Sequence, residues 1–267
     1  MTPVLEIATV TRRFGGLVAI DEVTTAIAPG EIRGIIGPNG AGKTTLLNIM
    51  SGHMRPSSGR VLFAGRDITK ARADKVAAMG VRRTFQNVRL FGEMTVLGNV
   101  LVGLHANGRA GIFAALLRTG RQRREEHSMI DTAMQALERV GLAAQANTIA
   151  SSLAYGHRKV LEIARAIVAA PKVLLLDEPA AGLNASEAAN LIGVIRRINA
   201  EGVTVAIVEH HMEVIMKVCS RITVLNYGKH LAEGTPAEVQ GNAQVIEAYL
   251  GRGGVAERIM ELKAAHA

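Results

Sequence analysis

The sequence predicts an α/β fold in which a parallel sheet is interrupted by a block of helices. Two observations carry this prediction. From residue 173 onward, short apolar runs alternate with amphipathic helical segments, which is the order of βαβ units in a parallel sheet. Residues 95–169, in contrast, show helical periodicity. The chain therefore predicts an α/β core with an inserted helical subdomain.

The first third of the chain contains the opening strands and a glycine-rich turn. The expected strands, rich in apolar and β-branched residues, are residues 5–11, 24–27, 31–36, 60–63 and 81–85. A helix is expected over residues 44–50, directly after the turn. This order of strand, turn and helix places a helix N-terminus at the end of a buried strand.

The helical block and the second half continue this organisation. One face of a first helix carries Ile130, Ala133, Met134, Leu137 and Val140, and Gly141 ends it. A second helical face carries Leu161, Ala164, Ile167 and Val168, before Pro171. The strands and helices that follow are expected at residues 173–176, 186–199, 203–208, 212–218 and 222–225.

Two helix starts and a tail are also visible. Asn184 and Glu187 are placed for a reciprocal cap, and residues 235–238, Thr-Pro-Ala-Glu, form a complete start signal. A last amphipathic stretch is expected at residues 255–262, fraying toward its end.

Composition limits the class of protein. Of 267 residues, 48% are hydrophobic and 20% charged, a balance typical of a globular domain. No run reaches the ~18 apolar residues that cross a bilayer, and the first ten residues lack the features of a signal peptide. The single cysteine, Cys219, excludes an intrachain disulfide and is expected to be an inert core thiol.

The net charge is strongly positive, +8 with a pI of about 10.1. Part of this charge is clustered at Arg118, Arg121, Arg123 and Arg124. Such a cluster is either a solvated helix face or a contact for anionic headgroups or a partner. No aromatic residues alternate with these arginines, so nucleic-acid binding is not expected.

Residues 37–44, Gly-Pro-Asn-Gly-Ala-Gly-Lys-Thr, fit the phosphate-loop pattern G-x-x-x-x-G-K-[ST]. The glycines let backbone N–H groups turn toward phosphate oxygens, and the helix N-terminus attracts negative charge. Lys43 is expected to face solvent and reach the β- and γ-phosphates, Thr44 to hold Mg²⁺, and Thr45 to donate to the α-phosphate. The candidate nucleotide-binding residues of this loop are Gly37, Pro38, Asn39, Gly40, Ala41, Gly42, Lys43, Thr44 and Thr45.

Two carboxylates, Asp177 and Glu178, follow the apolar run at residues 173–176. Adjacent acids at the carboxyl end of a buried parallel strand are costly unless a metal or water is bound there. Asp177 is expected to hold Mg²⁺ through water, and Glu178 to polarise an attacking water. With the phosphate loop, this pair indicates an enzyme that uses ATP and Mg²⁺; an ATPase, a nucleoside kinase and a helicase all satisfy it.

Further motifs distinguish among these classes. Residues 153–158, Leu-Ala-Tyr-Gly-His-Arg, resemble the signature motif of ABC ATPases, and residues 180–184 look like their D-loop. Gln86 looks like the Q-loop glutamine, His210 like the switch histidine, and Phe14 like the aromatic that stacks on adenine. The order and spacing of these motifs extend from residue 4 to about residue 250.

The resemblance implies a P-loop NTPase core with a parallel sheet, an antiparallel β portion at the N-terminus and an inserted helical subdomain. Residues 1–251 would form one domain, with the core at about 1–86 and 166–251 and the helical subdomain at about 87–165. Residues 252–267 would form a helical tail.

A narrower resemblance points to the ATPase subunits of branched-chain amino-acid importers (LivG-type). It is carried by residues 153–156, 177–184, 89–91, 94–96 and 245–251. Three positions depart from the usual pattern of ABC ATPases. Ala154 occupies the signature serine position, His157 replaces a usual glutamine, and His211 stands where an acid is usual.

The resemblance implies how the chain works. Two subunits, copies of this chain or a copy and a paralogue, would sandwich ATP between the phosphate loop of one and the signature of the other. Glu178 would act as base, Gln86 would sense Mg²⁺ and water, and His210 would fix the γ-phosphate. The signature residues Ala154, Tyr155 and Gly156 would contact the partner's nucleotide.

The same resemblance implies a place in the cell and a set of partners. The chain would be peripheral, on the cytoplasmic face of the inner or plasma membrane. It would push on membrane subunits (permeases) through the groove near residues 86–94. An external solute-binding protein would be an indirect partner.

Other functions are weighed against this one. A non-transport ABC ATPase usually carries two cassettes or a long insertion, and a small-molecule P-loop kinase leaves residues 153–156 and His210 unexplained. A non-catalytic adaptor would not need both Lys43 and Glu178. A metal site of Glu209, His210 and His211 is not expected, because adjacent residues at a strand end point to opposite sides.

Overall fold

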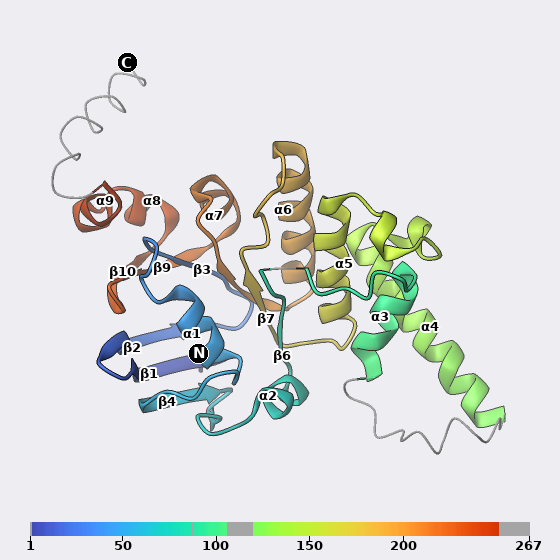
Figure 1. The fold of residues 1–267 in the computed structure, drawn as a ribbon, viewed down its shortest axis with the longest axis horizontal. Coiled ribbons are helices and arrows are strands. Elements are labelled where there is room, and N and C mark those ends of the chain that lie inside the picture. Colours follow the sequence, from blue (N-terminus) through green and yellow to red (C-terminus); the bar gives the residue numbers. More distant parts are fainter. Residues whose placement is uncertain (1, 87, 106–119, 251–267) are drawn as a thin grey trace.

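The computed structural model describes residues 2–86, 88–105 and 120–250 (Figure 1). Its strands are β1 (Leu5–Phe14), β2 (Leu17–Ile27), β3 (Ile32–Ile36), β4 (Ser58–Phe63), β5 (Arg66–Asp67), β6 (Val81–Arg83), β7 (Val173–Asp177), β8 (Thr204–Val208), β9 (Arg221–Asn226) and β10 (Lys229–Gly234). Its α-helices are α1 (Lys43–Met50), α2 (Ala73–Met79), α3 (Val96–His105), α4 (Gly120–Val140), α5 (Tyr155–Ile167), α6 (Ala185–Ala200), α7 (Met212–Val218), α8 (Pro236–Gln240) and α9 (Ala243–Leu250).

The larger sheet has the order β10-β9-β3-β8-β7-β6. Its pairs are parallel except for the antiparallel hairpin of β9 and β10. In the register, Asp177 at the end of β7 lies opposite Val208 at the end of β8. The segments that follow β3, β7 and β8 therefore leave the sheet at one edge, where ligands bind in open α/β folds.

The smaller sheet is antiparallel and has the order β2-β1-β4-β5. Figure 1 shows it in blue to cyan, with α1 between it and the larger sheet. Leu46 and Leu47 of α1 are fully buried in one apolar cluster with Ile7 of β1 and Ile35 of β3. Packing on both sides fixes the direction of α1 and so aims its N-terminus.

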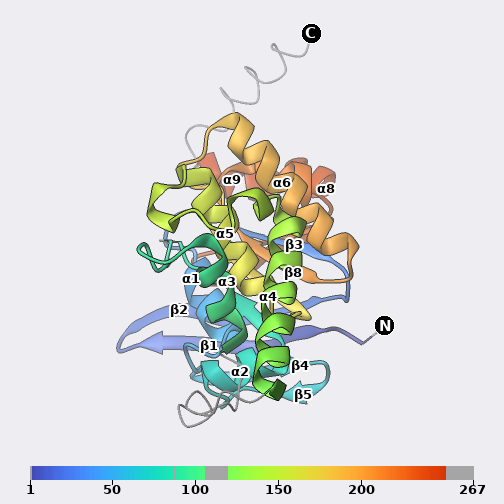
Figure 2. The ribbon, with the colours of Figure 1, turned by 90° about the vertical axis from the view of Figure 1, so that its right-hand side faces the viewer.

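The helices α3, α4 and α5 pack against one another beside the larger sheet, as Figures 1 and 2 show. Their apolar faces share a second core with α6 and with one face of the sheet. Leu137 of α4 and Leu161 of α5 are fully buried there. Within the described ranges, every helix is too short or too polar to cross a membrane.

Several sequence predictions are confirmed. Both expected capping boxes are present, at Asn184 with Glu187 and at Thr235 with Glu238. Cys219 is buried, and burial raises the pKa of its thiol to about 12, so the thiolate is strongly disfavoured. The expected stretch at residues 255–262 and Arg118 lie outside the described residues.

Three strands differ from the prediction. The expected strand at residues 24–27 is the end of a longer strand, because β2 pairs with β1 from Leu17 onward across several register shifts. The polar segment β10 was not predicted, since its strand conformation depends on hairpin pairing with β9 and not on apolar alternation. The expected strand at residues 81–85 ends at Arg83.

Candidate nucleotide-binding site

The phosphate loop joins β3 to α1 in the conformation that its glycines permit. Gly37 has φ 151° and Gly42 has φ 98°, values in the left-handed half of backbone space. A Cβ atom would lie 2.1 Å from the Leu225 carbonyl oxygen at Gly37 and 2.6 Å from the Ala19 carbonyl oxygen at Gly42. The loop is therefore held against β9 and β2, and only glycine fits at these positions.

Lys43 does not face solvent as the sequence predicted. Its side chain folds back over the loop, where Nζ donates to the carbonyl oxygens of Gly37 at 2.6 Å and Pro38 at 3.0 Å. Burial lowers the pKa of Lys43, and the nearby charge of Glu178 opposes that effect. The difference arises because α1 is packed between two sheets, so the first residue of the helix is enclosed by its own loop.

The acid pair lies at the carboxyl end of β7, and its two side chains have different partners. Asp177 is buried and accepts a hydrogen bond from Arg83 Nη2 at 2.9 Å. Arg83 also donates to Asn48 Oδ1 and Ser51 Oγ of α1 and its C-cap, so this pair ties β6, β7 and α1 together. A buried ion pair with these additional bonds fixes the position of the Asp177 carboxylate.

Glu178 is the central member of a polar cluster. Its backbone has φ 46°, an unusual value for a residue other than glycine and one often found at functional sites. Its Oε2 accepts from Gln86 Nε2 at 3.0 Å and lies 3.6 Å from His210 Nδ1. The structure thus brings together three side chains that are 32 to 124 positions apart, all predicted as catalytic.

Lys159 was missed by the sequence prediction although it contacts this cluster. It lies in the first turns of α5, is 3% exposed, and donates from Nζ to the Gln86 carbonyl oxygen at 2.8 Å and the Glu178 carbonyl oxygen at 3.4 Å. One turn further along, Glu162 Oε1 accepts from the Phe85 N–H at 3.3 Å, and burial raises the pKa of Glu162. The sequence offered one signal for Lys159: it is a charged residue within an apolar helical face. Buried charges need partners, so such a residue is expected to contact polar groups.

A cavity of about 370 Å³ lies over the phosphate loop. Its lining residues are Leu17, Val18, Ala19, Asn39, Gly40, Ala41, Gly42, Lys43, Thr44, Thr45, Glu178 and Tyr227. Seven of the nine predicted loop residues line it, together with Glu178. Leu17 and Tyr227 also line the cavity but were not predicted. Their side chains are 66% and 85% exposed. Each is a large residue beside a glycine-containing turn, and this was the signal in the sequence that could have identified them.

Phe14 does not line this cavity. It is the last residue of β1, 42% exposed, and the Arg12 guanidinium carbon lies 4.5 Å from the centre of its ring. One face of the ring is thus covered by a cation.

The segment resembling the signature motif starts α5, with Ala154 at the N-cap and Tyr155 as the first helical residue. A Cβ atom at Gly156 would lie 2.7 Å from Glu187 Oε1, and one at Gly182 would lie 3.2 Å from the Tyr155 ring. The segment therefore packs against residues 180–187. Neither Ala154 nor Tyr155 lines the cavity over the phosphate loop.

Comparison with known proteins decides the family. A family model described as "ABC transporter" matches residues 20–181, and one described as "Branched-chain amino acid ATP-binding cassette transporter" matches residues 229–255. The chain belongs to the ABC transporter ATP-binding family. This ABC ATPase is 45% identical over 250 residues to the high-affinity branched-chain amino acid transport ATP-binding protein LivG of Escherichia coli K12, covering 93% of this chain and 98% of LivG. It is 43% identical over 250 residues, with the same coverage, to the corresponding protein BraF of Pseudomonas aeruginosa.

Solved structures agree with this assignment. The ADP conformation of MJ1267, an ATP-binding cassette of an ABC transporter, matches with a TM-score of 0.83 and 30% identity over 94% of this chain and 100% of that one. The dimeric structure of MJ0796, a bacterial ABC transporter cassette, matches with a TM-score of 0.72 and 25% identity over 87% and 98% of the two chains. The predicted fold class and the predicted ATP-hydrolysing activity are confirmed for this ABC ATPase.

A second site prediction about the ABC ATPase is wrong. His210 and His211 were expected to point to opposite sides, but their ring centroids are 4.1 Å apart and their planes differ by 36°. The alternation of side chains applies within a strand, and β8 ends at Val208, so both histidines lie in the turn before α7. The buried Glu209 carboxylate shapes this turn, because its Oε2 accepts from the backbone N–H groups of both histidines at 3.0 and 3.1 Å.

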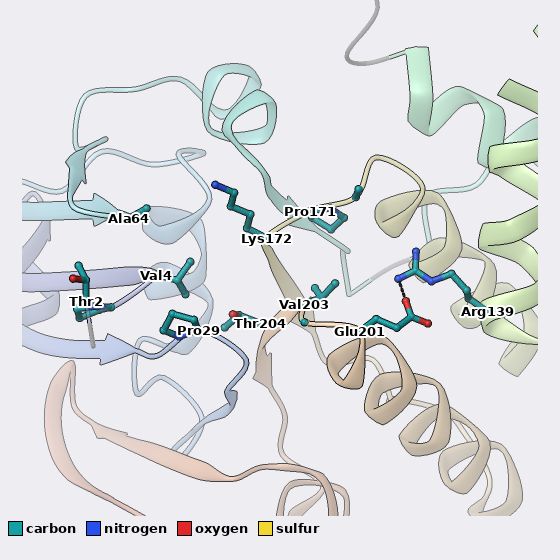
Figure 3. Close-up of a pocket in the computed structure, with 13 residues that line it drawn as sticks. Thr2, Val4, Pro29, Ala64, Arg139, Pro171, Lys172, Glu201, Val203 and Thr204 are labelled. Carbon is teal, nitrogen blue, oxygen red and sulfur yellow. Dashed lines mark ion pairs between the residues drawn. The ribbon is translucent and has the colours of Figure 1, made fainter. Parts of the chain in front are cut away.

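A larger cavity, of about 760 Å³, lies elsewhere in the ABC ATPase (Figure 3). It is bordered by Lys172 just before β7, by Thr204 at the start of β8, and by an ion pair of Arg139 and Glu201. These are the amino ends of the parallel strands. Size alone does not make this cavity the reaction site, because ligands of open α/β sheets bind at the carboxyl ends.

Proposed function

We propose that this ABC ATPase drives an importer of branched-chain or related amino acids. The match of residues 229–255 to the branched-chain model and the near full-length similarity to LivG and BraF support this cargo class. The observation that carries the catalytic part is the convergence of Gln86, Glu178 and His210 beside the phosphate loop.

The phosphate loop and the adjacent residues are proposed to hold the nucleotide. Backbone N–H groups of residues 37–42 and the N-terminus of α1 would bind the phosphate oxygens. The Lys43 ammonium would give up its hydrogen bonds to the two loop carbonyl oxygens and bind the β- and γ-phosphates instead. Thr45 would donate to the α-phosphate. The face of Phe14 opposite Arg12 would stack on adenine, with Tyr227 as a further wall.

Mg²⁺ is proposed as the metal of this site. The available donors are the Thr44 hydroxyl, the Gln86 amide oxygen and the Asp177 carboxylate, a set of oxygen ligands that suits Mg²⁺. Arg83 already occupies one oxygen of Asp177, which fits a role through water. When bound, the ion would neutralise charge on the phosphates.

Glu178 is proposed as the general base for the attacking water. Gln86 donates to its carboxylate, which orients the oxygen that would accept the proton. His210, within 3.6 Å of the same oxygen, would hold the γ-phosphate as charge develops on it. The arrangement acts by positioning and charge stabilisation, which is how phosphoryl transfer is catalysed in this class of enzyme.

A second ATPase subunit is proposed to complete the site. Ala154, Tyr155 and Gly156 would bind the partner's nucleotide through the N-terminus of α5, because Ala154 offers no hydroxyl. Membrane subunits would bind near residues 86–94, with an external solute-binding protein acting indirectly. The chain would then sit on the cytoplasmic face of the membrane.

The proposed domain division follows the same assignment. Residues 1–86 and 166–251 form the catalytic core, and residues 87–165 form the helical subdomain that carries the signature. Residues 252–267, proposed as a C-terminal helical tail, lie outside the described residues. The packing of α3, α4 and α5 against one another supports the division, although α5 itself reaches into the core through Lys159.

Glu178→Gln tests the catalytic assignment. The variant keeps the shape of the side chain and removes the base, so we expect loss of steady-state ATP turnover and an ATP-dependent dimer. Turnover and light scattering after size exclusion, with ATP and then ADP, measure both effects. Glu201→Gln, at the distant cavity, is the matched control. Near wild-type turnover by Glu178→Gln would exclude Glu178 as the base, and lack of a dimer even with the partner ATPase would exclude the sandwich.

Uptake measurements test the cargo. A strain that lacks the gene should take up less radiolabelled leucine under conditions in which the wild type expresses the protein. Restoring the wild-type gene should recover uptake, whereas restoring the Glu178→Gln variant should not. Unchanged leucine uptake in the deletion strain would contradict the proposed cargo.

A further inference from the structure

Four ligand-type side chains meet where β7 and β8 end. Oε2 of Glu209 lies 3.1 Å from His211 Nδ1 and 3.9 Å from His210 Nδ1. His210 Nδ1 lies 3.6 Å from Oε2 of Glu178. The ligand atoms of Glu209, His210 and His211 all lie within 4.8 Å of one another.

Three of these separations are close to the edges of a small tetrahedron. Zn²⁺ binds histidine nitrogen and carboxylate oxygen at about 2.0–2.2 Å in tetrahedral geometry, so two of its ligand atoms are about 3.3–3.6 Å apart. The three measured separations, 3.1, 3.6 and 3.9 Å, bracket that range. Three of the six edges of such a tetrahedron are therefore close to the required length, and every ligand-atom separation among Glu209, His210 and His211 is at most 4.8 Å.

The cluster also has a fixed anchor and an open side. Glu209 is fully buried, and three backbone N–H groups, those of Ala180, His210 and His211, donate to its carboxylate. These bonds keep a charged group in place without a side-chain cation. The side chains of His210 and His211 are 49% and 45% exposed, which gives an ion a path from solvent.

The mixture of nitrogen and oxygen atoms selects the type of ion. Two imidazoles with two carboxylates suit Zn²⁺ and its neighbours in the transition series, whereas Mg²⁺ prefers oxygen ligands alone. Each carboxylate oxygen has two lone pairs, so Oε2 of Glu178 has capacity for an ion beside its bond from Gln86. Oε2 of Glu209 already accepts two backbone N–H groups, so the oxygen that Glu209 offers to an ion is Oε1, which accepts only from Ala180. His211, which departs from the acid usual at this position, supplies the second nitrogen.

We propose that Glu178, Glu209, His210 and His211 form a binding site for a Zn²⁺-type cation, and that its occupation stops ATP hydrolysis. The inhibitory half rests on the proposed roles of Glu178 and His210. A Glu178 carboxylate bound to the cation cannot take a proton from water, and His210 is held away from the γ-phosphate. The phosphate loop is not part of the cluster, so ATP still binds.

Metal binding to the nucleotide-free full chain tests the site itself. Co²⁺ bound in tetrahedral geometry has a characteristic absorption, which reports its binding. Displacement of this Co²⁺ by Zn²⁺ from a chelator buffer then gives the affinity and stoichiometry of Zn²⁺. We expect one ion per wild-type chain and at least about tenfold weaker binding by His211→Asn, since even the loss of an outer-shell partner costs 10–100-fold. His127→Asn, which removes an exposed histidine on α4, is the matched control and should bind like the wild type.

Asparagine is a good N-cap residue, so His211→Asn should keep α7 folded, and its melting temperature without metal checks this. If it does not fold, His210→Asn, which loses another ligand, replaces it in the same measurement. Absence of a tetrahedral Co²⁺ spectrum, or equal affinity in the wild type and the folded variant, overturns the proposed site.

The rate of ATP turnover with excess Mg-ATP, measured at buffered concentrations of free Zn²⁺, tests inhibition. The rate of each protein is divided by its own rate without zinc. Half-inhibition of the wild type should occur at the measured dissociation constant, and His211→Asn should need at least about tenfold more Zn²⁺. Equal inhibition of both proteins would place the effect at the nucleotide-bound metal and overturn the inhibitory half. Zinc-free turnover of Glu178→Gln reports separately on the proposed function.

Discussion

Lys159 links α5 to the polar cluster around Glu178, and its replacement gives a sharp test of that link. The ammonium group donates to the Gln86 carbonyl oxygen at 2.8 Å and to the Glu178 carbonyl oxygen at 3.4 Å. The first distance is within the optimum for such a bond and the second is near its limit. Lys159→Met keeps most of the buried volume and removes both bonds.

The expected loss of stability follows from these two bonds. A hydrogen bond from a charged donor contributes about 1.5–3 kcal/mol, and the longer bond adds little. We therefore expect the free energy of unfolding to fall by about 2 kcal/mol, which lowers the melting temperature of a chain of this size by about 4–8 °C. The loss is limited because the variant no longer buries an ammonium group.

The expected loss of activity is larger. Without Lys159, the backbones of Gln86 and Glu178 are free to shift, and a displacement of about 1 Å at a catalytic group costs about 10²-fold in rate. We expect kcat to fall by about this factor while KM for ATP stays close to the wild-type value, because Lys159 does not line the cavity over the phosphate loop.

Steady-state ATPase kinetics and thermal denaturation measure the two effects. Lys172→Met is the matched control: this lysine is exposed just before β7, so neither quantity should change. A Lys159→Met variant that melts at a lower temperature but turns over at the wild-type rate would refute the reasoning. Such a result would mean that Lys159 stabilises the fold without positioning the cluster.

Three further predictions follow from the structure. Lys43→Ala should reduce Mg-ATP binding at least about 10²-fold while the chain stays folded, because it removes the ammonium of the phosphate loop; equilibrium binding of a fluorescent ATP analogue decides this, and wild-type affinity would contradict it. Gly193→Ala should raise the free energy of unfolding by about 0.5–1 kcal/mol in chemical denaturation, since Gly193 lies within α6 with open space around its Cβ position, and a loss of stability would contradict it. Burial would raise the pKa of Glu233, but hydrogen bonds with His230 and Arg33 hold it well below its usual range. A depressed folded pKa gives stability that is present above the unfolded value of about 4.3 and is lost as pH falls below it, so Glu233→Gln should flatten the pH dependence of the melting temperature in that acid range; an unchanged profile would contradict this.

Local sequence patterns predicted most of the site. The phosphate loop and the acid pair were recognisable because each depends on a few consecutive residues next to a buried strand. The capping boxes at Asn184 and Thr235 were predicted for the same reason, and the structure shows both. The resemblance to ABC ATPases implied that Gln86, Glu178 and His210 act together, and the structure brings their side chains together.

The sequence by itself therefore predicted the fold class, the phosphate loop and the position of the acid pair Asp177 and Glu178, because these follow from short-range periodicity and motif chemistry. Only the tertiary structure decided where individual side chains point. Lys43 is enclosed because two sheets hold α1, and Lys159 reaches Gln86 from 73 positions away. His210 and His211 share one side because Glu209 binds both backbone N–H groups in the turn after β8. The directions of Lys43 and Lys159 depend on packing between elements distant in the chain, and those of the histidines depend on a turn outside any strand. Periodicity along one element carries no information about any of them.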